Sequence, residues 1–193
     1  LQALLRAADV FSQSYRPGSL AARGFSVEEA MALRPGIVYV TLSAFSHAGP
    51  WRSRRGFDTL VQAVSGIANE YALDELPRLL PVSALDYITG YLAAFGVMVA
   101  LSRRARDGGS YHVRVSLAQT GRWLTGLGRV APNLVAAAPV NLTPERLAAL
   151  SMTSDTPFGR LTHLAPVVQL SETPAHWERP AVPLDYDEPR WLP

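Results

Sequence analysis

Asp86 occupies the most distinctive position among the acidic residues of this sequence. It directly precedes the stretch from Tyr87 to Ser102, a run of 16 residues that contains no charge. A carboxylate at the N-terminus of a helix is favoured by free N–H groups and by the helix dipole, and apolar neighbours that exclude water can make it a nucleophile. The same position also suits a residue that only caps the helix. The local pattern leaves both roles open.

Small residues and arginines gather in a second candidate region. Ser43–Pro50 follows an apolar strand pattern, and ligands of open α/β sheets bind beyond the carboxyl ends of the strands. Arg52, Arg54 and Arg55 come next, and guanidinium groups bind phosphate or carboxylate through forked hydrogen bonds. The alternatives are an ordinary connection between a strand and a helix, and a solvated arginine loop. His47, alone in this loop, is interpreted as a surface histidine.

The composition excludes several classes of chemistry for this chain. Its 193 residues include no cysteine, so it has no disulfide, no thiolate metal site and no cysteine nucleophile. All 18 basic residues are arginine, which excludes a lysine Schiff base. The four histidines, at positions 47, 112, 163 and 176, lack the spacing of metal ligands, and we expect no metal site.

Charge and hydropathy are typical of a globular protein. The net charge of +2 is too small to indicate a nucleic-acid partner. The charge-free run is shorter than the roughly 20 residues that cross a bilayer, so we expect a buried central helix and no membrane span. No signal peptide is visible, and we expect a cytoplasmic protein. The chain opens at Leu1 within a helical pattern, which favours a fragment of a longer protein.

Residues 1–130 alternate between patterns typical of helices and patterns typical of strands. Apolar periodicity, β-branched runs, glycine and proline predict helix 1–8, strand 9–11, helix 26–34, strand 37–42, helix 59–69, helix 87–102, strand 111–115 and helix 117–130. This order predicts an α/β fold in which helices flank a parallel sheet. Ser26 and Glu29 have the spacing of a capping box, and Asp58 suits the N-cap of the helix that follows it.

The chain after residue 130 has a different character. Residues 131–193 are rich in proline and show little periodicity. They contain one predicted helix, Pro144–Leu150, with proline in its first turn, and one predicted strand, Leu164–Leu170. From Pro157 onward we expect mainly extended chain. The sequence therefore predicts an α/β portion over 1–130 and an irregular C-terminal segment over 131–193.

Four short segments share the order and spacing of one known family. They are Ala8-Asp9-Val10 running to Tyr15-Arg16-Pro17-Gly18, then Pro35 to Pro50, then Arg55-Gly56-Phe57-Asp58 with Gln62 and Ser65-Gly66, and finally Asp86 to Gly90 with Gly109 and the strand Tyr111–Leu117. A weaker match, Leu170 to Pro174, lies near the C-terminus. In this arrangement the chain resembles the class III CoA-transferases, also called the CaiB/BaiF family. The specific signal is the order of the segments over residues 8–120.

The resemblance implies a covalent mechanism and gives Asp86 the role of nucleophile. In this family the aspartate of the fourth segment attacks an acyl-CoA thioester and forms an acyl-aspartyl mixed anhydride, and CoA then passes to an acceptor carboxylic acid. The implied substrates are a coenzyme A thioester and a carboxylic acid, with no metal and no permanently bound cofactor. Contacts with the CoA substrate are implied for Ser14, Tyr15, Arg16, Arg23, Arg55 and Phe57, the last as a wall of the acyl pocket.

Phe57 separates a transferase from a second activity of the same family. Racemase relatives place an acid/base histidine there, and phenylalanine cannot move a proton. The resemblance therefore favours an acyl-CoA:carboxylate CoA-transferase, with an acyl-CoA racemase or isomerase as the alternative.

The length of the chain is the main departure from the family. Family members are about twice as long and form interlocked dimers. Most of their small domain and their N-terminal Rossmann segment have no counterpart here, so we expect an interlocked homodimer or a partner chain that supplies the missing half. A third hypothesis is a non-catalytic remnant or assembly subunit that keeps the fold.

Overall fold

The structure is a computed structural model that describes residues 1–72, 75–136 and 141–191. The chain divides into two compact units, Leu1–Arg129 and Val130–Pro193, and each is described by itself. The first unit contains Asp86 and all six residues for which CoA contacts are expected.

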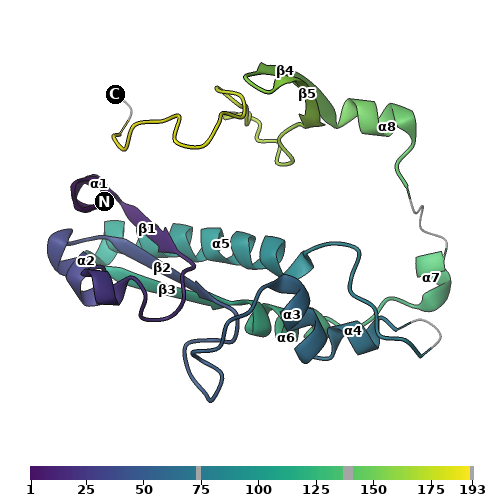
Figure 1. Ribbon diagram of the computed structural model, residues 1–193, viewed down its shortest axis with the longest axis horizontal. Helices are drawn as coiled ribbons and strands as arrows, with labels where there is room; N and C mark the ends of the chain where they lie inside the picture. The colour runs from purple at the N-terminus through teal and green to yellow at the C-terminus, as the bar shows by residue number, and fades with distance from the viewer. Residues whose placement is uncertain (73–74, 137–140, 192–193) are drawn as a thin grey trace. The chain divides into compact units, whose positions relative to one another are not determined.

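The first unit alternates helices and strands in the expected order (Figure 1). Its elements are α1 (Gln2–Ala7), β1 (Val10–Gln13), a short 3₁₀ helix (Ala21–Arg23), α2 (Val27–Leu33), β2 (Val38–Ser43), α3 (Asp58–Val64), α4 (Ile67–Glu70), α5 (Ala84–Asp107), β3 (Tyr111–Ser116) and α6 (Leu117–Gly126). The α/β succession expected from the sequence is confirmed.

Three parallel strands form the sheet of the first unit, in the order β1-β2-β3. The central strand β2 pairs Val38 with Val10 of β1 and with Tyr111 of β3. Successive residues of a strand face opposite sides of a sheet. Tyr39 accordingly packs with the helices α1 and α2, whereas Val38 and Val40 pack with α5 on the other side. The parallel sheet flanked by helices is therefore confirmed.

Parallel strands end at the same edge of a sheet, and this edge brings distant parts of the sequence together. The segment Ser14–Gly18 leaves this edge after β1, and the segment 44–57 leaves it after β2. Both of the loops for which ligand contacts are expected therefore start from one edge, as the rule for open α/β sheets requires.

Local signals explain the start of one helix and the interruption of another. The capping box is confirmed, because Glu29 N–H donates to Ser26 Oγ at 3.1 Å and Ser26 N–H donates to the Glu29 carboxylate at 2.8 Å. The single helix expected over 59–69 is wrong. Gly66 has a φ of +89° and divides this segment into α3 and α4, because a helix does not continue through a left-handed residue.

Helix α5 is longer and more exposed than expected. It begins three residues before the expected range 87–102 and continues to Asp107, and of its described residues Leu85, Thr89 and Ala100 are the buried ones. An exposed apolar stripe runs along the helix and consists of Tyr87, Tyr91, Phe95 and Met98. The expectation of a fully buried central helix is wrong for this chain, since α5 packs against the sheet with one side.

By length and composition alone, α5 is also a candidate membrane span. Its most apolar window of 18 residues has a mean hydropathy of 1.6, and 17% of that window is buried. Core helices of globular proteins can have the same composition. Ala93, Val97 and Ala100 of α5 pack against the β2 strand. The expectation that the chain does not cross a membrane stays a prediction.

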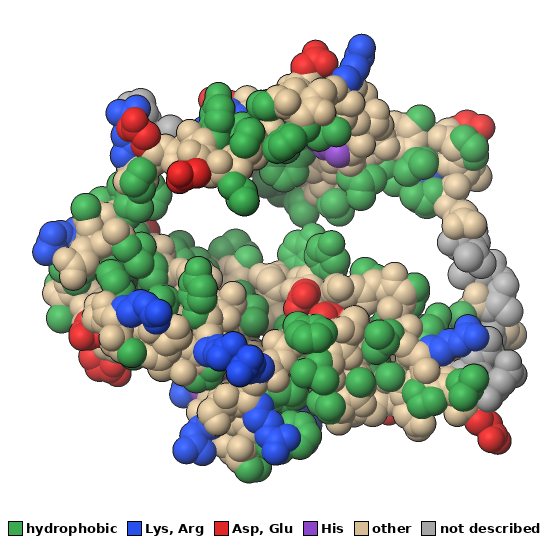
Figure 2. Space-filling view, viewed as in Figure 1, with side chains coloured by type: hydrophobic (Ala, Val, Ile, Leu, Met, Phe, Trp, Pro, Cys, Tyr) green, Lys and Arg blue, Asp and Glu red, His purple; other side chains and the backbone are tan. Residues whose placement is uncertain are grey.

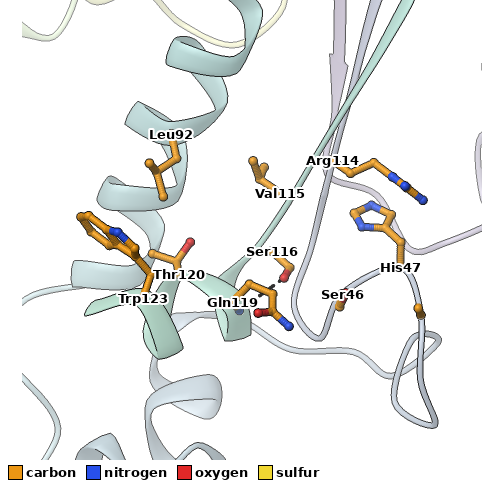
Figure 3. A pocket seen from close by; sticks show the side chains of 10 residues that line it. Ser46, His47, Leu92, Arg114, Val115, Ser116, Gln119, Thr120 and Trp123 are labelled. Atoms are coloured by element: carbon orange, nitrogen blue, oxygen red, sulfur yellow. Dashed lines mark hydrogen bonds between the residues drawn. The ribbon is translucent and has the colours of Figure 1, made fainter. Parts of the chain in front are cut away.

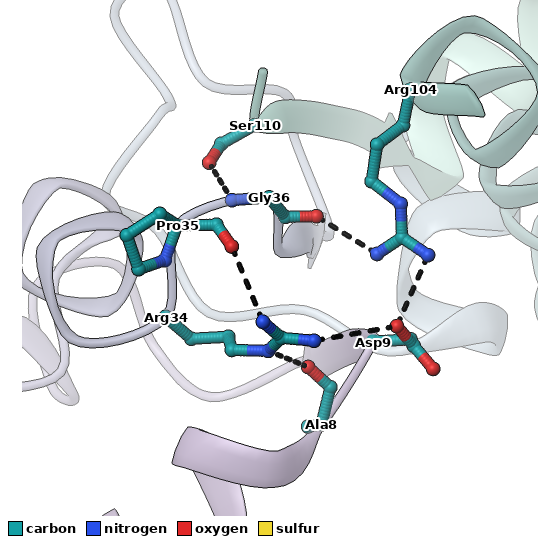
Figure 4. A network of polar contacts seen from close by, with 7 residues as sticks. All are labelled: Ala8, Asp9, Arg34, Pro35, Gly36, Arg104 and Ser110. Carbon is teal, nitrogen blue, oxygen red and sulfur yellow. Dashed lines mark hydrogen bonds and ion pairs between the residues drawn. The ribbon is translucent and has the colours of Figure 1, made fainter. Parts of the chain in front are cut away.

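The last turns of α5 are tied to the opposite edge of the sheet, where the strands begin (Figure 4). The Arg104 guanidinium donates to the Gly36 carbonyl at 2.9 Å and to the Asp9 carboxylate at 3.0 Å. Asp9 also lies 3.8 Å from the Arg34 guanidinium, and Gly36 N–H donates to Ser110 Oγ at 2.9 Å. Asp9 directly precedes β1, Ser110 directly precedes β3, and Gly36 lies two residues before β2. Arg104 therefore links the end of α5 to the start of the sheet.

The second unit contains α7 (Pro132–Ala136), α8 (Pro144–Ala149) and a hairpin of β4 (Ser151–Thr156) and β5 (Gly159–Leu164). The helix expected at Pro144–Leu150 is confirmed, with Pro144 in its first turn and Thr143 Oγ1 accepting a hydrogen bond from Arg146 N–H at 3.3 Å. From Ala165 to Trp191 the chain is irregular, as expected for this proline-rich part.

The strand expected at Leu164–Leu170 is wrong. The strand in this region, β5, ends at Leu164 and pairs in antiparallel fashion with β4. The hairpin places polar residues opposite one another, for example Thr153 opposite Thr162. The strands of this hairpin contain many polar residues and show little apolar alternation, so the sequence did not predict them. The apolar run after Leu164, which the sequence predicted as a strand, is not part of the hairpin.

The close approach of α5 to the sheet gives a test of this packing. A Cβ atom at Gly96 would lie 2.7 Å from Cγ1 of Val113, whereas a Cβ at Gly90 would meet nothing within 4 Å. We expect Gly96→Ala to lower the free energy of unfolding by about 1–2 kcal/mol, because crowding a stiff valine outweighs the gain in helix propensity. We expect Gly90→Ala to raise it by about 0.5–1 kcal/mol. Urea unfolding of both variants checks this, and equal effects of the two would contradict the packing.

Candidate active site

Asp86 is the third residue of α5 and lies in its first turn. Ser83 is the residue at the N-cap position, so the alternative in which Asp86 caps its own helix is wrong. The Asp86 side chain is exposed. Within the described residues its carboxylate accepts no hydrogen bond and forms no ion pair. The structure thus leaves this carboxylate open to react.

The backbone N–H of Asp86 is held by a second carboxylate. Asp58, in the first turn of α3, accepts this hydrogen bond through Oδ2 at 2.9 Å. Its side chain is 3% exposed, and its other oxygen accepts a hydrogen bond from the Gln62 amide. The N-terminal N–H groups of a helix have no partner within the helix, so Asp58 satisfies a donor that α5 itself cannot. The expected role of Asp58 as N-cap of its own helix is wrong, because Phe57 is at that position.

Gln62 fixes the segment that leads into α5. It is fully buried, and its Oε1 accepts a hydrogen bond from Leu80 N–H at 2.8 Å. Its amide nitrogen also donates to the Val82 carbonyl at 3.3 Å. Asp58 and Gln62 are four residues apart on α3, a spacing at which side chains of a helix meet. Together they hold both the entry and the first turn of α5.

The surroundings of Asp86 raise the pKa of its carboxyl group above the ordinary value. The larger cause is burial, because neighbouring atoms remove water from the charged form even though the side chain as a whole is exposed. The second cause is the negative charge of Asp58. Both effects oppose the helix dipole, which favours the carboxylate. A carboxylate whose charge is less well stabilised is more basic and more reactive as a nucleophile.

Four of the residues expected to contact CoA line one cavity of about 170 Å³. Ser14, Tyr15 and Arg16 come from the loop after β1, and Arg55 comes from the loop after β2. Exposed arginines gather on the loop after β2, as the blue side chains in Figure 2 show. The cavity is smaller than the roughly 300 Å³ at which drug-sized ligand pockets begin. It therefore fits a part of a large ligand, such as a phosphate group.

Two further residues of this cavity belong to segments that the sequence marks as candidates, but the sequence gives neither of them a role of its own. Ser43, the last residue of β2, is 8% exposed, and its Oγ has no hydrogen-bond partner within the described residues. Buried hydroxyl groups without a partner are uncommon in folded proteins, and this one belongs to a residue of the cavity. Gly56 is needed for its size, because a Cβ there would lie 2.7 Å from Cβ of Ala44 and 2.9 Å from the Phe45 ring. This contact seats Arg55 beside the loop after β1.

The cavity and Asp86 are close because the chain between them is short. Gly56 lines the cavity and lies two residues before Asp58, so their Cα atoms are at most about 7 Å apart. Asp58 in turn is hydrogen-bonded to the backbone of Asp86. Phe57, between these two points, has a side chain that is 64% exposed. The structure thus joins the arginine-lined cavity to the N-terminus of α5 through the single segment 55–58.

The sequence pattern described as "CoA-transferase family III" matches residues 1–141, which is most of the chain and includes all of the first unit. The chain belongs to CoA-transferase family III. Its fold agrees with a crystal structure of a CAIB/BAIF family protein from Brucella suis, with a TM-score of 0.62, 26% identity, and coverage of 82% of this chain and 43% of that one.

Curated relatives of this family III chain carry the names of CoA-transferases. A succinyl-CoA–D-citramalate CoA-transferase of Chloroflexus aurantiacus is 29% identical over 185 residues, which cover 86% of this chain and 45% of the relative. An acetyl-CoA:oxalate CoA-transferase of Acetobacter aceti is 34% identical over 116 residues, which cover 59% of this chain and 30% of the relative. The chain therefore spans less than half the length of these relatives.

Arg23 does not line the cavity that contains Ser14, Tyr15, Arg16 and Arg55. It belongs to the short 3₁₀ helix, and its guanidinium donates to the carbonyl and the hydroxyl of Ser19 at 2.8 and 3.1 Å. A contact between Arg23 and CoA stays a prediction.

A larger cavity, of about 440 Å³, lies elsewhere in this unit; residues 46–48 of the candidate loop line it, but none of the residues expected to contact CoA does. Figure 3 shows His47 and Arg114 close together on one side of it and Leu92 and Trp123 on the other. Burial, and next the positive charge of Arg114, lower the pKa of His47. The His47 side chain is half-buried, so its interpretation as a surface histidine is wrong. The described residues contain no group of three or more His, Asp or Glu side chains that could hold a metal ion.

The raised pKa of Asp86 predicts a pH-dependent effect on stability. The Asp86 carboxyl group binds a proton more tightly in the folded chain than in the unfolded chain, where its pKa has the ordinary value of 3.8. At neutral pH the group is ionised, and its ionised form lowers the free energy of unfolding. We expect Asp86→Asn to be slightly more stable than the unmodified chain at pH 7, by no more than about 0.5 kcal/mol because the side chain is exposed. The advantage should shrink as the pH falls toward 3.8.

Urea unfolding at several pH values measures this effect, and Asp107→Asn is the matched control. Arg106, through a hydrogen bond, lowers the pKa of Asp107, so the sign is opposite. We expect that variant to be less stable than the unmodified chain at pH 7, with a difference that also shrinks on acidification. A loss of stability in Asp86→Asn at pH 7 would contradict the raised pKa of Asp86.

Proposed function

We propose that this chain is the catalytic portion of an acyl-CoA:carboxylate CoA-transferase, with Asp86 as its nucleophile. The observation that carries the proposal is the Asp86 carboxylate. It is exposed, it has no hydrogen-bond partner among the described residues, and its pKa is raised. The first turn of its helix is hydrogen-bonded to Asp58, and Asp58 lies two residues after Gly56 of the cavity lined by guanidinium groups. A reactive carboxylate next to an anion site suits a CoA thioester, which carries phosphates at one end and an acyl group at the other.

The proposed reaction begins with attack of an Asp86 oxygen on the carbonyl carbon of an acyl-CoA thioester. A carbon–oxygen bond forms, the carbon–sulfur bond breaks, and CoA leaves as the thiolate. The product on the protein is an acyl-aspartyl mixed anhydride, which preserves the activation of the acyl group. The acceptor carboxylate attacks the carboxyl carbon of Asp86 in this anhydride and displaces the donor as its carboxylate. The CoA thiolate then attacks the acyl carbon of the acceptor in the new anhydride, which forms the thioester product and releases the Asp86 carboxylate. Each step exchanges one carboxylate or thiolate for another, so no redox cofactor or metal is required.

The residues around Asp86 have distinct roles in this proposal. Arg16 and Arg55 bind phosphate groups of CoA, because guanidinium groups form forked hydrogen bonds with phosphate. Ser14 and Tyr15 line the same cavity and contact the nucleotide part. The exposed ring of Phe57 forms one wall of the acyl pocket. Phenylalanine cannot act as an acid or base, which favours transfer over racemisation.

The substrates and the assembly state are also proposed. Relatives named for succinyl-CoA with citramalate and for acetyl-CoA with oxalate support an acyl-CoA donor and a carboxylic acid acceptor. The chain spans less than half of these relatives, and the apolar stripe of α5 next to Asp86 is exposed. These two facts support a site completed by a second copy of the chain, in an interlocked homodimer, or by a partner chain.

A non-catalytic remnant is the second candidate function. The partial coverage of the relatives favours it, because more than half of each relative's length lies outside the match with this chain. A remnant would keep the sheet and α5 but form no covalent adduct. An acyl-CoA racemase would instead exchange the α-hydrogen of an acyl-CoA for solvent deuterium.

Trapping of the covalent intermediate tests the proposal. The chain is mixed with a panel of acyl-CoAs and quenched with hydroxylamine, and peptide mass spectrometry then locates any aspartyl hydroxamate. We expect the hydroxamate at Asp86 and none in Asp86→Asn, because the amide cannot form an anhydride. The same test is run on a longer form of the protein if its gene encodes residues before Leu1.

Each outcome of the trapping experiment has a definite meaning. A hydroxamate only in the longer form means that this chain is one part of the site. Absence of the adduct in both forms, when both are folded, contradicts the transferase and favours the remnant. Deuterium at the α-carbon without a hydroxamate favours the racemase.

The cavity predicts a specific effect on CoA binding. We expect Arg55→Ala to raise the Kd for CoA roughly tenfold, which corresponds to about 1.4 kcal/mol and to the loss of one charged hydrogen-bond donor. Arg52→Ala is the matched control, because Arg52 does not line the cavity and donates instead to the Gly49 carbonyl at 3.3 Å. Isothermal titration calorimetry at two salt concentrations measures both variants. Equal Kd values for the two would contradict a phosphate contact at Arg55.

A further inference from the structure

Asp58 is a buried carboxylate that the proposed reaction does not consume. Its side chain is 3% exposed, and it forms no ion pair within the described residues. Burial of an unpaired charge is unfavourable unless hydrogen bonds compensate for it. Two donors reach Asp58, the backbone N–H of Asp86 and the amide of Gln62. A costly group in contact with the candidate nucleophile needs an explanation beyond the stability of the fold.

We propose that Asp58 is the positioning residue of Asp86: its buried carboxylate, oriented by Gln62, holds the backbone N–H of Asp86 and sets where the nucleophile lies. The inference rests on the proposed role of Asp86 in catalysis. The hydrogen bond of 2.9 Å joins residues 28 positions apart and crosses from α3 to α5. It acts on the backbone of Asp86 and leaves both oxygens of the Asp86 side chain free.

The hydrogen bonds of Gln62 fix which groups can face Asp58. The Gln62 carbonyl oxygen accepts from Leu80 N–H at 2.8 Å, so its amide nitrogen must face Asp58. Both side-chain oxygens of Asp58 must therefore accept a hydrogen bond, one from Gln62 and one from the Asp86 N–H. Asparagine offers a single acceptor, and its NH₂ group would meet another donor in either orientation. The chemistry of this contact requires the carboxylate.

The charge of Asp58 also acts on Asp86. It raises the pKa of the Asp86 carboxyl group in addition to burial. Among the described residues Asp58 is the charged group whose field raises this pKa, and the entry segment 80–83 carries no titratable side chain. Asp58 thus affects both the place and the basicity of the nucleophile.

Two variants separate the role of the charge from the role of the fold. Asp58→Asn removes the charge and one acceptor. The double variant Asp58→Asn with Gln62→Glu moves the carboxylate to position 62, where it can accept from Leu80 N–H and from the amide at position 58, at the loss of the longer hydrogen bond to the Val82 carbonyl. The double variant then keeps the acceptor for Asp86 N–H. Asp9→Asn is the matched control, since Asp9 is tied to α5 at its other end through Arg104.

The readouts do not depend on activity. In the full chain, NMR follows the titration of the Asp86 side-chain carboxyl and the hydrogen exchange of the Asp86 amide. We expect slow exchange of this amide in the unmodified chain, although N–H groups of a first helical turn usually exchange fast for lack of a partner. We expect Asp58→Asn to move the Asp86 titration midpoint to lower pH and to speed exchange, the double variant to restore slow exchange, and Asp9→Asn to change neither.

The hydroxylamine assay adds the catalytic consequence. We expect adduct formation at Asp86 to slow by roughly tenfold to a hundredfold in Asp58→Asn, as displacement of a reacting group by about 1 Å does. The double variant should recover part of the rate, a recovery that a merely structural role would not require.

Failure of this inference differs from failure of the proposed function. An adduct in the unmodified chain, with the Asp86 titration and exchange unchanged in Asp58→Asn, overturns the positioning role alone. Absence of an adduct in every form overturns the transferase, while the NMR results still decide whether Asp58 positions Asp86. If both variants fail to fold, fast exchange of the Asp86 amide in the unmodified chain overturns the proposal and slow exchange supports it.

Discussion

The site depends on how the N-terminus of α5 is fixed in space. The two ends of this helix are held by groups of opposite charge, the Asp58 carboxylate at the first turn and the Arg104 guanidinium near the last. This distribution complements the helix dipole, which is positive at the N-terminus and negative at the C-terminus. Arg104 binds Gly36 and Asp9 at the edge where strands begin, while Asp58 belongs to the edge where they end. The helix therefore spans the sheet with each end anchored.

Parallel topology explains why the contact residues meet. Ser14 and Arg55 are 41 positions apart, yet both follow strands that run side by side in the same direction and end at one edge. The segment 55–58 then connects this edge to α3, and Gly56 permits the close contact with Phe45 that keeps the segment in place. One short piece of chain thus provides an arginine for the cavity and a carboxylate for the helix.

Local interactions could be predicted from the sequence, and interactions between elements could not. The capping box of Ser26 and Glu29 depends on four adjacent residues, and it was predicted correctly. Asp58 has the same kind of local pattern, but its partner is a backbone N–H 28 residues away, so the sequence suggested a cap for the wrong helix. The spacing of Asp58 and Gln62 could have indicated their contact, because residues four apart meet on a helix. Ser43 begins the candidate loop Ser43–Pro50, but only the fold shows that its hydroxyl is buried without a partner.

The exposed side of α5 explains why composition overestimated its burial. An apolar pattern on every side of a helix is typical of a helix that is covered on every side. Here the sheet covers one side, and the stripe that includes Tyr87 and Tyr91 is exposed and starts at the residue after Asp86. A surface that covers the first turn of α5 together with this stripe removes water from Asp86, and loss of water raises the pKa of a carboxyl group further. The covering of the first turn of α5 and the basicity of the Asp86 carboxylate, the nucleophile of the proposed reaction, are linked in this way by solvation alone.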